Sequence, residues 1–430
     1  MNRLRLQLTG LVCAAGLSAV ATAQDGPIPV EIRGEPGNFM LYRGGEPYHV
    51  RGAGAETLGD LESLAANGAN SVRTWRPGDG SVLDIAHELD LTVALCIEIA
   101  RERHGFDYDD EEAVARQFEE AREIVLRYRD HPALLAWIIG NEMNLEYENP
   151  RVYDAINDIS RMIHELDPYH PTTTTTAGMW GDLAREIRQR APDLDFLSVQ
   201  VYGAVYDLPL MLAEVDPEMP LMITEWGTIG HWEVPLTEWG APIELNSSAK
   251  ADVYSRAFEE MLAPMRGRLI GNYAFLWGQK QERTPTWYGV FTADGRSTEA
   301  VDVLHRIWTG QWPDNRAPLL GEMRLEGKQA DESIRLAAGQ ESTAAVSAED
   351  LDGDRLIFDW RVMEESTATQ TGGDPEDIPP ELDGLIADPA LPEINVRAPA
   401  SPGAYRLFVY VGDGQGRVAH ANIPFYVDAN

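Results

Sequence analysis

The sequence predicts an α/β fold, in which a (β/α)8 TIM barrel is followed by a small all-β, immunoglobulin-like sandwich. Between about Pro47 and Trp308, short apolar runs alternate with amphipathic stretches, which is the pattern of repeated strand–helix units around a parallel sheet. Beyond Trp312 the helical pattern ends, and short β-rich runs stand between Asp-, Gly- and Pro-rich stretches. The chain has 430 residues, which is enough for two or three domains.

Eight apolar runs are the candidate strands of the barrel. They cover residues 49–53, 71–75, 91–97, 133–140, 172–177, 196–201, 221–224 and 272–277. Eight strands within about 260 residues match the size of a (β/α)8 barrel. Two of the stretches between them carry apolar residues at helical spacing, for example Val114, Phe118 and Val125, and Ile156 and Ile163. We expect these apolar stripes to pack against the barrel rather than to bind a ligand.

The first 23 residues have the pattern of a secretory signal peptide. Arg3 and Arg5 precede an apolar run from Leu8 to about Val20, and Ala21-Thr22-Ala23 follows as a cleavage site. The alternative is a membrane anchor, but this run is shorter than the roughly 20 residues that a spanning helix needs. The sequence therefore predicts an exported protein, periplasmic or extracellular, with no membrane insertion.

Three further segments follow this leader. Residues 24–46 contain short alternating runs that begin at Val30 and Phe39, with Gly44-Gly45 at a turn, and we expect a β-hairpin that caps the barrel. Residues 47–312 form the predicted barrel, and residues 313–430 form the predicted sandwich. Once the leader is removed, Cys96 is the only cysteine, so no intramolecular disulfide is expected.

The charge of the chain restricts its partners. Lys and Arg number 35 and Asp and Glu number 70, which gives a formal net charge of −35. Such a surface repels phosphate groups, so nucleic acids and anionic membrane surfaces are excluded as partners. A neutral polysaccharide or oligosaccharide remains compatible with this charge.

Two glutamates stand where predicted barrel strands end. Glu142 follows the apolar run that closes with Gly140, and Glu225 follows the run Leu221-Met-Ile-Thr. By our count these runs are the fourth and seventh strands, and polar groups at the carboxyl ends of barrel strands face the active site. A carboxylate that ends a buried strand is costly unless it is paired or used. Two carboxylates across one barrel mouth suit the cleavage of a glycosidic bond.

These motifs resemble the (β/α)8 clan of retaining glycoside hydrolases called clan GH-A. The resemblance covers about residues 28–310 and includes Asn141-Glu142, Glu225, Ser71-Val-Arg73-Thr-Trp75, Val199-Gln-Val-Tyr202-Gly and Phe275-Leu-Trp277-Gly. Within the clan, the chain is most similar to the catalytic barrel of glycoside hydrolase family 2, and it also has features of the fungal β-1,3-glucanosyltransferases.

The resemblance implies a role for each of these residues. It makes Glu142 the general acid/base and Glu225 the nucleophile of a double displacement with net retention. It implies that Arg73 and Tyr202 stabilise the carboxylate of Glu225. It further implies that Asn141 binds the sugar 2-hydroxyl. Trp277 would be the aromatic platform under the sugar.

Other side chains of the predicted barrel mouth are candidates for binding substrate. Trp75 ends the second predicted strand and Glu98 follows the third, whereas His231, Trp232 and Trp287 lie in the loops after the seventh and eighth strands. Aromatic rings interleaved with hydrogen-bonding groups suit pyranose rings. The alternatives are a structural salt bridge for Glu98, as for Glu56, and loop packing for Trp287.

The sequence carries no motif for a cofactor. The run Asp350-Leu-Asp352-Gly-Asp354 resembles the acidic turn of PKD or cadherin-like modules, and it suits either Ca²⁺ or a solvated turn. An EF-hand is excluded because Arg361 stands about twelve positions on, where that motif needs a glutamate. Zinc, dinucleotide and phosphate-loop spacings are absent from the sequence. We expect no metal and no cofactor.

The sequence thus predicts a retaining enzyme that hydrolyses a β-linked glycan, with a β-glucan first among the substrates. One alternative is a β-glucan transglycosylase that uses the same two glutamates and passes the sugar to another glycan. A more remote alternative is a non-catalytic glycan-binding protein, although such a protein would not need to keep both Glu142 and Glu225.

Overall fold

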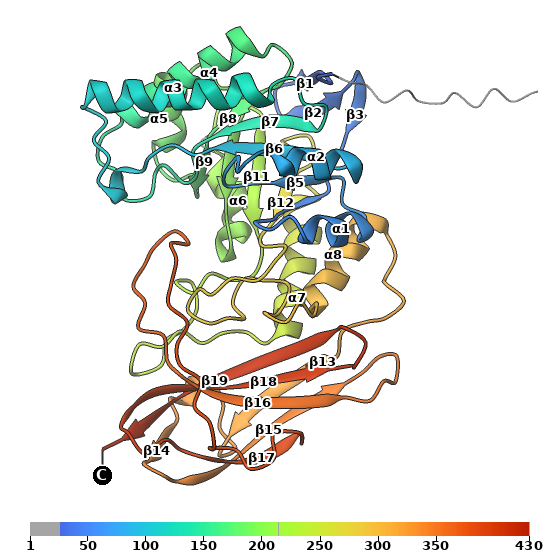
Figure 1. Ribbon diagram of the computed structural model, residues 1–430, viewed down its shortest axis with the longest axis vertical. Helices are drawn as coiled ribbons and strands as arrows, with labels where there is room; N and C mark the ends of the chain where they lie inside the picture. Colours follow the sequence, from blue (N-terminus) through green and yellow to red (C-terminus); the bar gives the residue numbers. More distant parts are fainter. Residues whose placement is uncertain (1–25, 214, 430) are drawn as a thin grey trace, which may run out of the picture.

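The structure is a computed structural model that describes residues 26–213 and 215–429. The predicted signal peptide lies outside the described residues. In the part of the chain that is described, no helix is both long enough and apolar enough to cross a bilayer. Two bodies lie one above the other, the barrel and an all-β unit (Figure 1).

A closed parallel sheet forms the barrel, which confirms the predicted fold class. Its strands are β4 (Gly52–Gly54), β5 (Ser71–Arg73), β6 (Thr92–Ile97), β7 (Leu134–Ile139), β8 (Thr172–Thr173), β9 (Thr175–Ala177), β10 (Leu197–Gln200), β11 (Leu221–Trp226) and β12 (Leu269–Ala274). β12 pairs with β4, while β8 pairs with β7 and β9 pairs with β10. Because β8 and β9 are two halves of one strand interrupted at Thr174, the sheet has eight positions and no free edge.

Helices follow the barrel strands and cover the sheet. They are α1 (Asp60–Ala66), α2 (Ser81–Glu88), α3 (Glu111–Tyr128), α4 (Arg151–Leu166), α5 (Leu183–Arg190), α6 (Leu208–Ala213), α7 (Ser247–Arg256) and α8 (Glu299–Thr309), with the short helices η1 (Glu102–His104), η2 (Gly203–Asp207) and η3 (Ala257–Leu262). The side chain of Asp110 caps α3 by accepting two backbone N–H groups. The stripes of α3 and α4 bury Ala121, Val125, Ile156 and Ile163 against the barrel.

A small antiparallel sheet closes the barrel at its amino-terminal end. It consists of β1 (Val30–Glu35), β2 (Asn38–Arg43) and β3 (Glu46–Tyr48). Val30 and Leu41 of this sheet pack against Cys96, Leu135 and Tyr273 of the barrel strands. The floor of the barrel is therefore filled with apolar side chains, and the opposite, carboxyl-terminal end is left for polar groups.

Two antiparallel sheets form the C-terminal sandwich around one shared core. The first contains β13 (Leu319–Leu325), β15 (Glu341–Glu349) and β17 (Glu393–Arg397). The second contains β14 (Arg335–Ala337), β16 (Ile357–Glu364), β18 (Gly403–Gly412) and β19 (Val418–Asp428), in which β14 alone runs parallel to its neighbour, β19. A short helix, η4 (Ala330–Glu332), precedes β14.

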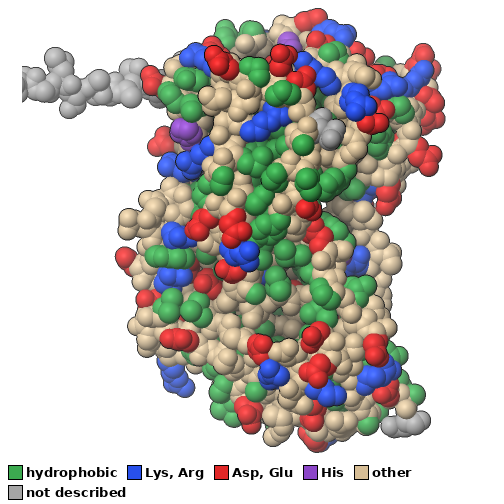
Figure 2. All heavy atoms as spheres, turned by 180° about the vertical axis from the view of Figure 1, so that it is seen from behind, with side chains coloured by type: hydrophobic (Ala, Val, Ile, Leu, Met, Phe, Trp, Pro, Cys, Tyr) green, Lys and Arg blue, Asp and Glu red, His purple; other side chains and the backbone are tan. Residues whose placement is uncertain are grey.

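The acidic turn of the sandwich is closed by its own backbone. Asp350 Oδ1 accepts the N–H groups of Asp352 at 3.0 Å and Asp354 at 2.8 Å. Within the described residues, no group of three or more His, Cys, Asp or Glu side chains is arranged to hold a metal ion. Acidic and basic side chains are interspersed over the barrel and the sandwich on the face in Figure 2, so the negative charge is spread rather than gathered there.

A buried polar cluster fixes the sandwich to the carboxyl-terminal side of the barrel. Glu244, in the loop after β11, pairs with Lys250 of α7 at 2.5 Å and accepts a hydrogen bond of 2.6 Å from Asn422 of β19. Thr284 in the loop after β12 also donates to Glu244, at 2.6 Å. Because these charges are paired and hydrogen-bonded, their burial is compatible with a stable interface. The cluster places the sandwich beside the barrel mouth.

Candidate active site

Glu225 lies in β11, at the mouth of the barrel, and is held by three donors. Arg73 Nη1 reaches its Oε1 at 2.5 Å, and Trp75 Nε1 donates to the same oxygen at 2.8 Å. Tyr202 Oη donates to its Oε2 at 2.8 Å. The residue is 5% exposed, so these donors replace water around the charged carboxylate. The arrangement stabilises an ionised, correctly oriented carboxylate.

Arg73 connects this carboxylate with the strand that ends in Asn141. Its side chain is fully buried in β5, and its guanidinium lies 4.4 Å above the Trp75 ring centroid. Its second amino group donates to Asn141 Oδ1. A buried cation is tolerated here because it is paired with Glu225 and both of its terminal amino groups are hydrogen-bonded, while its Nε has no partner among the described residues.

The side chain of Asn141 is oriented by its hydrogen bonds. Besides Arg73, Gln200 Nε2 donates to Asn141 Oδ1 at 2.8 Å, and Thr175 Oγ1 does so at 3.3 Å. Because the oxygen accepts from these groups, the amide nitrogen must be the atom that points away from them. That nitrogen has no acceptor among the described residues, so it is available to a ligand. Gln200, which was not among the predicted site residues, is the last residue of β10 and lies two positions before Tyr202.

Glu142 has a different environment from Glu225. The residue is 9% exposed, and its carboxyl accepts no hydrogen bond from the residues that the structure describes. Burial and the charge of Glu225 raise the pKa of Glu142 to about 8. The nearby charges of Arg73, Arg103 and Arg101 oppose this rise only in part. Glu142 therefore keeps its proton at neutral pH and can serve as an acid.

Aromatic rings line the mouth beside the two carboxylates. The centroid of Phe275, in the first residue after β12, lies 5.5 Å from Trp75, 5.7 Å from Tyr202 and 5.8 Å from Tyr288, each in an edge-on arrangement. Trp232 is 58% exposed and lies edge-on to Tyr202 at 5.6 Å. The sequence motif contained Phe275, but its position next to Tyr202 and Trp75 was not predicted.

The predicted platform, Trp277, does not lie in this wall. Its side chain is fully buried in the barrel core, with ring centroids 5.3 Å from Phe291 and 5.4 Å from Trp308 of α8. The reason is that β12 ends at Ala274, so that the chain beyond it turns Trp277 towards the helical layer. The prediction for Trp277 is corrected, and Phe275 is the aromatic residue that the end of β12 brings to the mouth.

Other predicted binding residues have structural contacts. Trp287 is 1% exposed and donates to the backbone oxygen of Ile229 at 3.0 Å, so it is a packing residue and not a sugar-stacking surface. His231 Nδ1 forms a hydrogen bond of 2.9 Å with Tyr288 Oη. Burial lowers the pKa of His231 to about 4, so its ring is neutral at neutral pH. Glu98 forms a surface ion pair of 3.8 Å with Arg76, which corresponds to the structural alternative.

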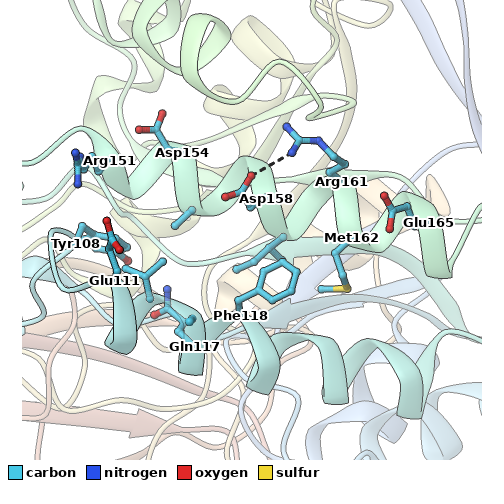
Figure 3. Close-up of a pocket in the computed structure, with 14 residues that line it drawn as sticks. Tyr108, Glu111, Gln117, Phe118, Arg151, Asp154, Asp158, Arg161, Met162 and Glu165 are labelled. Carbon is cyan, nitrogen blue, oxygen red and sulfur yellow. Dashed lines mark hydrogen bonds and ion pairs between the residues drawn. The ribbon is translucent and has the colours of Figure 1, made fainter.

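Two hollows lie outside the carboxylate pair. A groove between α3 and α4 is lined by apolar side chains such as Phe118 and Met162 and by charged ones such as Glu111 and Arg151 (Figure 3). No barrel strand end contributes to that groove, so it is separate from the carboxylates. A second hollow, at the mouth, is lined by residues 55–58 and by Trp75, Arg76 and Pro77, and it adjoins Glu225 through Trp75.

Part of the barrel is similar in sequence to known proteins. Residues 50–230 match the family described as glycosyl hydrolases family 2, TIM barrel domain. A mannan endo-1,4-beta-mannosidase F of Aspergillus clavatus is 36% identical over 90 residues, which cover 17% of this chain and 20% of that protein.

Solved structures share the fold at low sequence identity. A β-glucuronidase of Bacteroides uniformis aligns with a TM-score of 0.51 and 14% identity over 93% of this chain and 48% of that one. A β-glucuronidase of Faecalibacterium prausnitzii has a TM-score of 0.52 and 20% identity, over 65% of this chain and 52% of that one. A family 2 β-galacturonidase of Eisenbergiella tayi has a TM-score of 0.51 and 18% identity, over 66% and 55%. The chain spans about half the length of these structures. Over residues 50–230 it is similar to the TIM barrel domain of the glycosyl hydrolases of family 2.

Proposed function

We propose that this protein is an exported retaining glycoside hydrolase that cleaves a β-linked glycan by double displacement. The observation that carries the proposal is the contrast between its two strand-end carboxylates. Glu225 is surrounded by an arginine and two further donors. Glu142 has no such donor and a raised pKa. A retaining glycosidase needs one ionised nucleophile and one protonated acid at the same bond.

In the first step of this mechanism, Glu225 attacks the anomeric carbon while Glu142 gives its proton to the leaving glycosidic oxygen. The products are a covalent glycosyl-enzyme and a released alcohol. In the second step, the carboxylate of Glu142 takes a proton from water, and the resulting oxygen nucleophile attacks the anomeric carbon and releases Glu225. Two inversions at one carbon give net retention of configuration.

Asn141 and the aromatic wall support binding of the sugar in this proposal. The free amide nitrogen of Asn141 is directed to donate to the 2-hydroxyl, a contact that strengthens as the transition state forms. Phe275 presents a ring against which the C–H groups of a pyranose can pack.

The substrate is proposed to be a β-glucan, with other β-linked glycans as the alternatives. The similar proteins include a β-mannosidase, β-glucuronidases and a β-galacturonidase. The site for any of them must combine the same carboxylate pair with different loop contacts. The panel of substrates should therefore contain soluble β-glucan, mannan and β-glucuronides.

The proposal of export depends on the composition of residues 1–23, with two arginines, an apolar run and an Ala-Thr-Ala site. Expression of the full chain in a bacterial host with fractionation tests it. We expect processed protein in the periplasm that begins near Gln24, and unprocessed protein in the cytoplasm would contradict export.

Labelling of the nucleophile tests the catalytic assignment. The full chain is incubated with a panel of activated 2-deoxy-2-fluoro β-glycosides, and the adduct is located by peptide mass spectrometry. We expect the label on Glu225, and a label on another residue would overturn the assignment. Activity of Glu142→Ala on an aryl glycoside should recover with azide and give a product of retained configuration. Products longer than the substrate in the same reactions would favour transglycosylation over hydrolysis.

A further inference from the structure

A segment of the sandwich reaches the barrel mouth. The long loop between β16 and β17 leaves the sandwich and rises towards the barrel (Figure 1). Its residues 370–376, called the bridge segment below, contact loops that follow three barrel strands.

One anchor of the bridge segment is an ion pair with the loop after β6. Arg103 donates to both carboxylate oxygens of Asp374, at 2.8 and 3.2 Å, and to the backbone oxygen of Thr371 at 2.9 Å. His104 Nε2 lies 2.9 Å from the same carboxylate. The Arg103 side chain is 4% exposed, so this bidentate contact is shielded from solvent.

A second anchor joins the bridge segment to the loop after β12. Lys280 Nζ donates to the backbone oxygen of Gly373 at 2.7 Å. The side chain of Glu376 is 1% exposed, and it accepts the backbone N–H of Arg283 at 2.7 Å. A buried carboxylate that accepts a backbone N–H and faces a guanidinium at 3.8 Å is a specific contact rather than a solvated loop.

The backbone conformation favours glycine at the centre of the bridge segment. Gly372 and Gly373 have φ of +62° and +72°, a region that side chains disfavour. A Cβ at Gly372 would lie 2.8 Å from Leu145 Cδ1, in the loop after β7, and one at Gly373 would lie 2.5 Å from Lys280 Nζ. A side chain at either position would therefore have to displace the end of Leu145 or Lys280.

The segment joins loops on two distant sides of the barrel mouth. In the ring, the order β7-β6-β5-β4-β12 puts β12 four positions from β7 and three positions from β6. The segment is bound to Arg103 in the loop after β6 and to Lys280 in the loop after β12, and its Gly372 lies against Leu145 in the loop after β7.

The anchors also lie beside both catalytic candidates. Burial and Glu225 raise the pKa of Glu142, and the charge of Arg103 opposes this rise. Burial raises the pKa of Glu282, and the negative charges of Glu376 and Glu225 raise it further. Arg103, which anchors one end of the segment, is thus within electrostatic reach of Glu142, and Glu376 at the other end acts on Glu282, a carboxyl that Glu225 also affects.

We propose that the bridge segment is a specificity determinant that makes the sandwich part of the substrate site and restricts the enzyme to the ends of glycan chains. This inference rests on the proposed function. The physical reason is one of topology. A continuous stretch of backbone that joins loops on distant sides of the mouth obstructs the sideways entry of the middle of a long glycan, whereas a chain end can still enter. Asp374 and Glu376 are the residues that position the bridge.

Hydrogen exchange on the full chain tests the geometry without a substrate. We expect peptides that contain residues 370–376 to be protected in the wild type. The double variant Asp374→Asn/Glu376→Gln should lose that protection, together with peptides of the loop around Arg103. The matched control is Asp377→Asn, because Asp377 is exposed on the same loop and has no hydrogen bond or ion pair among the described residues. A wild-type segment that exchanges as fast as a free loop would overturn the proposal.

The pattern of cleavage tests the consequence. For the polysaccharide of the panel that the wild type degrades, solution viscosity is followed against the number of new reducing ends. We expect little loss of viscosity per bond for the wild type and for Asp377→Asn. The loss of viscosity per new reducing end should rise several-fold when residues 370–376 are replaced by a Gly-Ser segment of equal length. Equal ratios for the wild type and the replaced chain would overturn the proposal. Absence of both labelling at Glu225 and cleavage would instead overturn the proposed function, and the exchange result would still decide whether the bridge is closed.

Discussion

The guanidinium of Arg73 lies 2.5 Å from the carboxylate of Glu225, with the two side chains 0% and 6% exposed. The pair joins β5 to β11 across the barrel, and the same guanidinium also donates to Asn141 on the strand of Glu142. One buried cation therefore positions the proposed nucleophile and the residue that precedes the proposed acid. Loss of this cation should affect both catalysis and folding.

Replacement of Arg73 should lower both the stability of the fold and kcat/KM. Arg73→Met leaves the buried Glu225 carboxylate without its cation, and breaking a buried pair costs about 3–5 kcal/mol of stability. Chemical denaturation should show that loss, and kcat/KM should fall by roughly two or more orders of magnitude because the nucleophile is no longer oriented. Arg73→Lys is the matched control, since it keeps the charge but cannot contact Glu225 and Asn141 together. Full activity of Arg73→Met would contradict the role of the pair.

Tyr202→Phe tests one hydrogen bond with little change in packing. The phenol donates to Glu225 Oε2 at 2.8 Å, while the ring packs against Phe275 and Tyr288. Hydrogen bonds to charged groups contribute about 1.5–3 kcal/mol, so kcat/KM should fall by roughly 10- to 100-fold. The unfolding temperature should also fall by a few degrees, because the buried carboxylate loses a donor although the ring contacts remain. A variant with normal kinetics would show that Glu225 does not depend on this donor.

The raised pKa of Glu142 sets the alkaline limit of activity. Since the free enzyme needs the protonated carboxyl, kcat/KM should fall as the pH rises through about 8. Arg103 opposes the rise in this pKa, so Arg103→Met should raise the pKa further and move the alkaline limb to higher pH. The pH profile of an aryl glycoside substrate measures both effects. An alkaline limb that stays in place, or moves to lower pH, would contradict an electrostatic contact between Arg103 and Glu142.

The same raised pKa predicts a conflict between stability and activity. In the unfolded chain the Glu142 carboxyl ionises near its ordinary pKa of about 4.5, whereas in the folded chain it stays protonated up to about 8. Ionisation therefore stabilises the unfolded state progressively between these two values, and the folded protein loses stability as the pH rises through this window. Glu142→Gln removes this loss of stability, because glutamine does not ionise. We expect it to raise the unfolding temperature at pH 7 but not at pH 4, while it abolishes turnover of unactivated substrates. An equal shift at both pH values would contradict this account.

Much of the architecture could be predicted because it depends on simple periodicities. Alternating apolar runs and amphipathic stretches gave the ring of strands, and the chemistry of strand ends led to Glu142 and Glu225. The bridge segment could not be predicted, since it depends on how a loop of the sandwich folds back over a distant part of the chain. Its contact between Asp374 and Arg103 joins residues 271 positions apart. Gln200 was missed because a lone glutamine in an apolar run has no pattern that distinguishes it.

The error at Trp277 has a physical cause that can be tested. Residues 275 and 277 have the same parity, so alternation along a strand would place both on one face, but β12 ends at Ala274 and that rule no longer applies beyond it. Phe275 thus reaches the mouth while Trp277 enters the core. Phe275→Leu should lower kcat/KM by about two- to tenfold, through the loss of an aromatic contact of about 0.5–1.5 kcal/mol, with a smaller loss of stability than Trp277→Phe. Trp277→Phe should do the reverse, with a loss of about 1–3 kcal/mol of stability and near-normal kcat/KM. If Trp277→Phe impaired catalysis as much as Phe275→Leu while leaving stability unchanged, the original platform prediction for Trp277 would have to be restored.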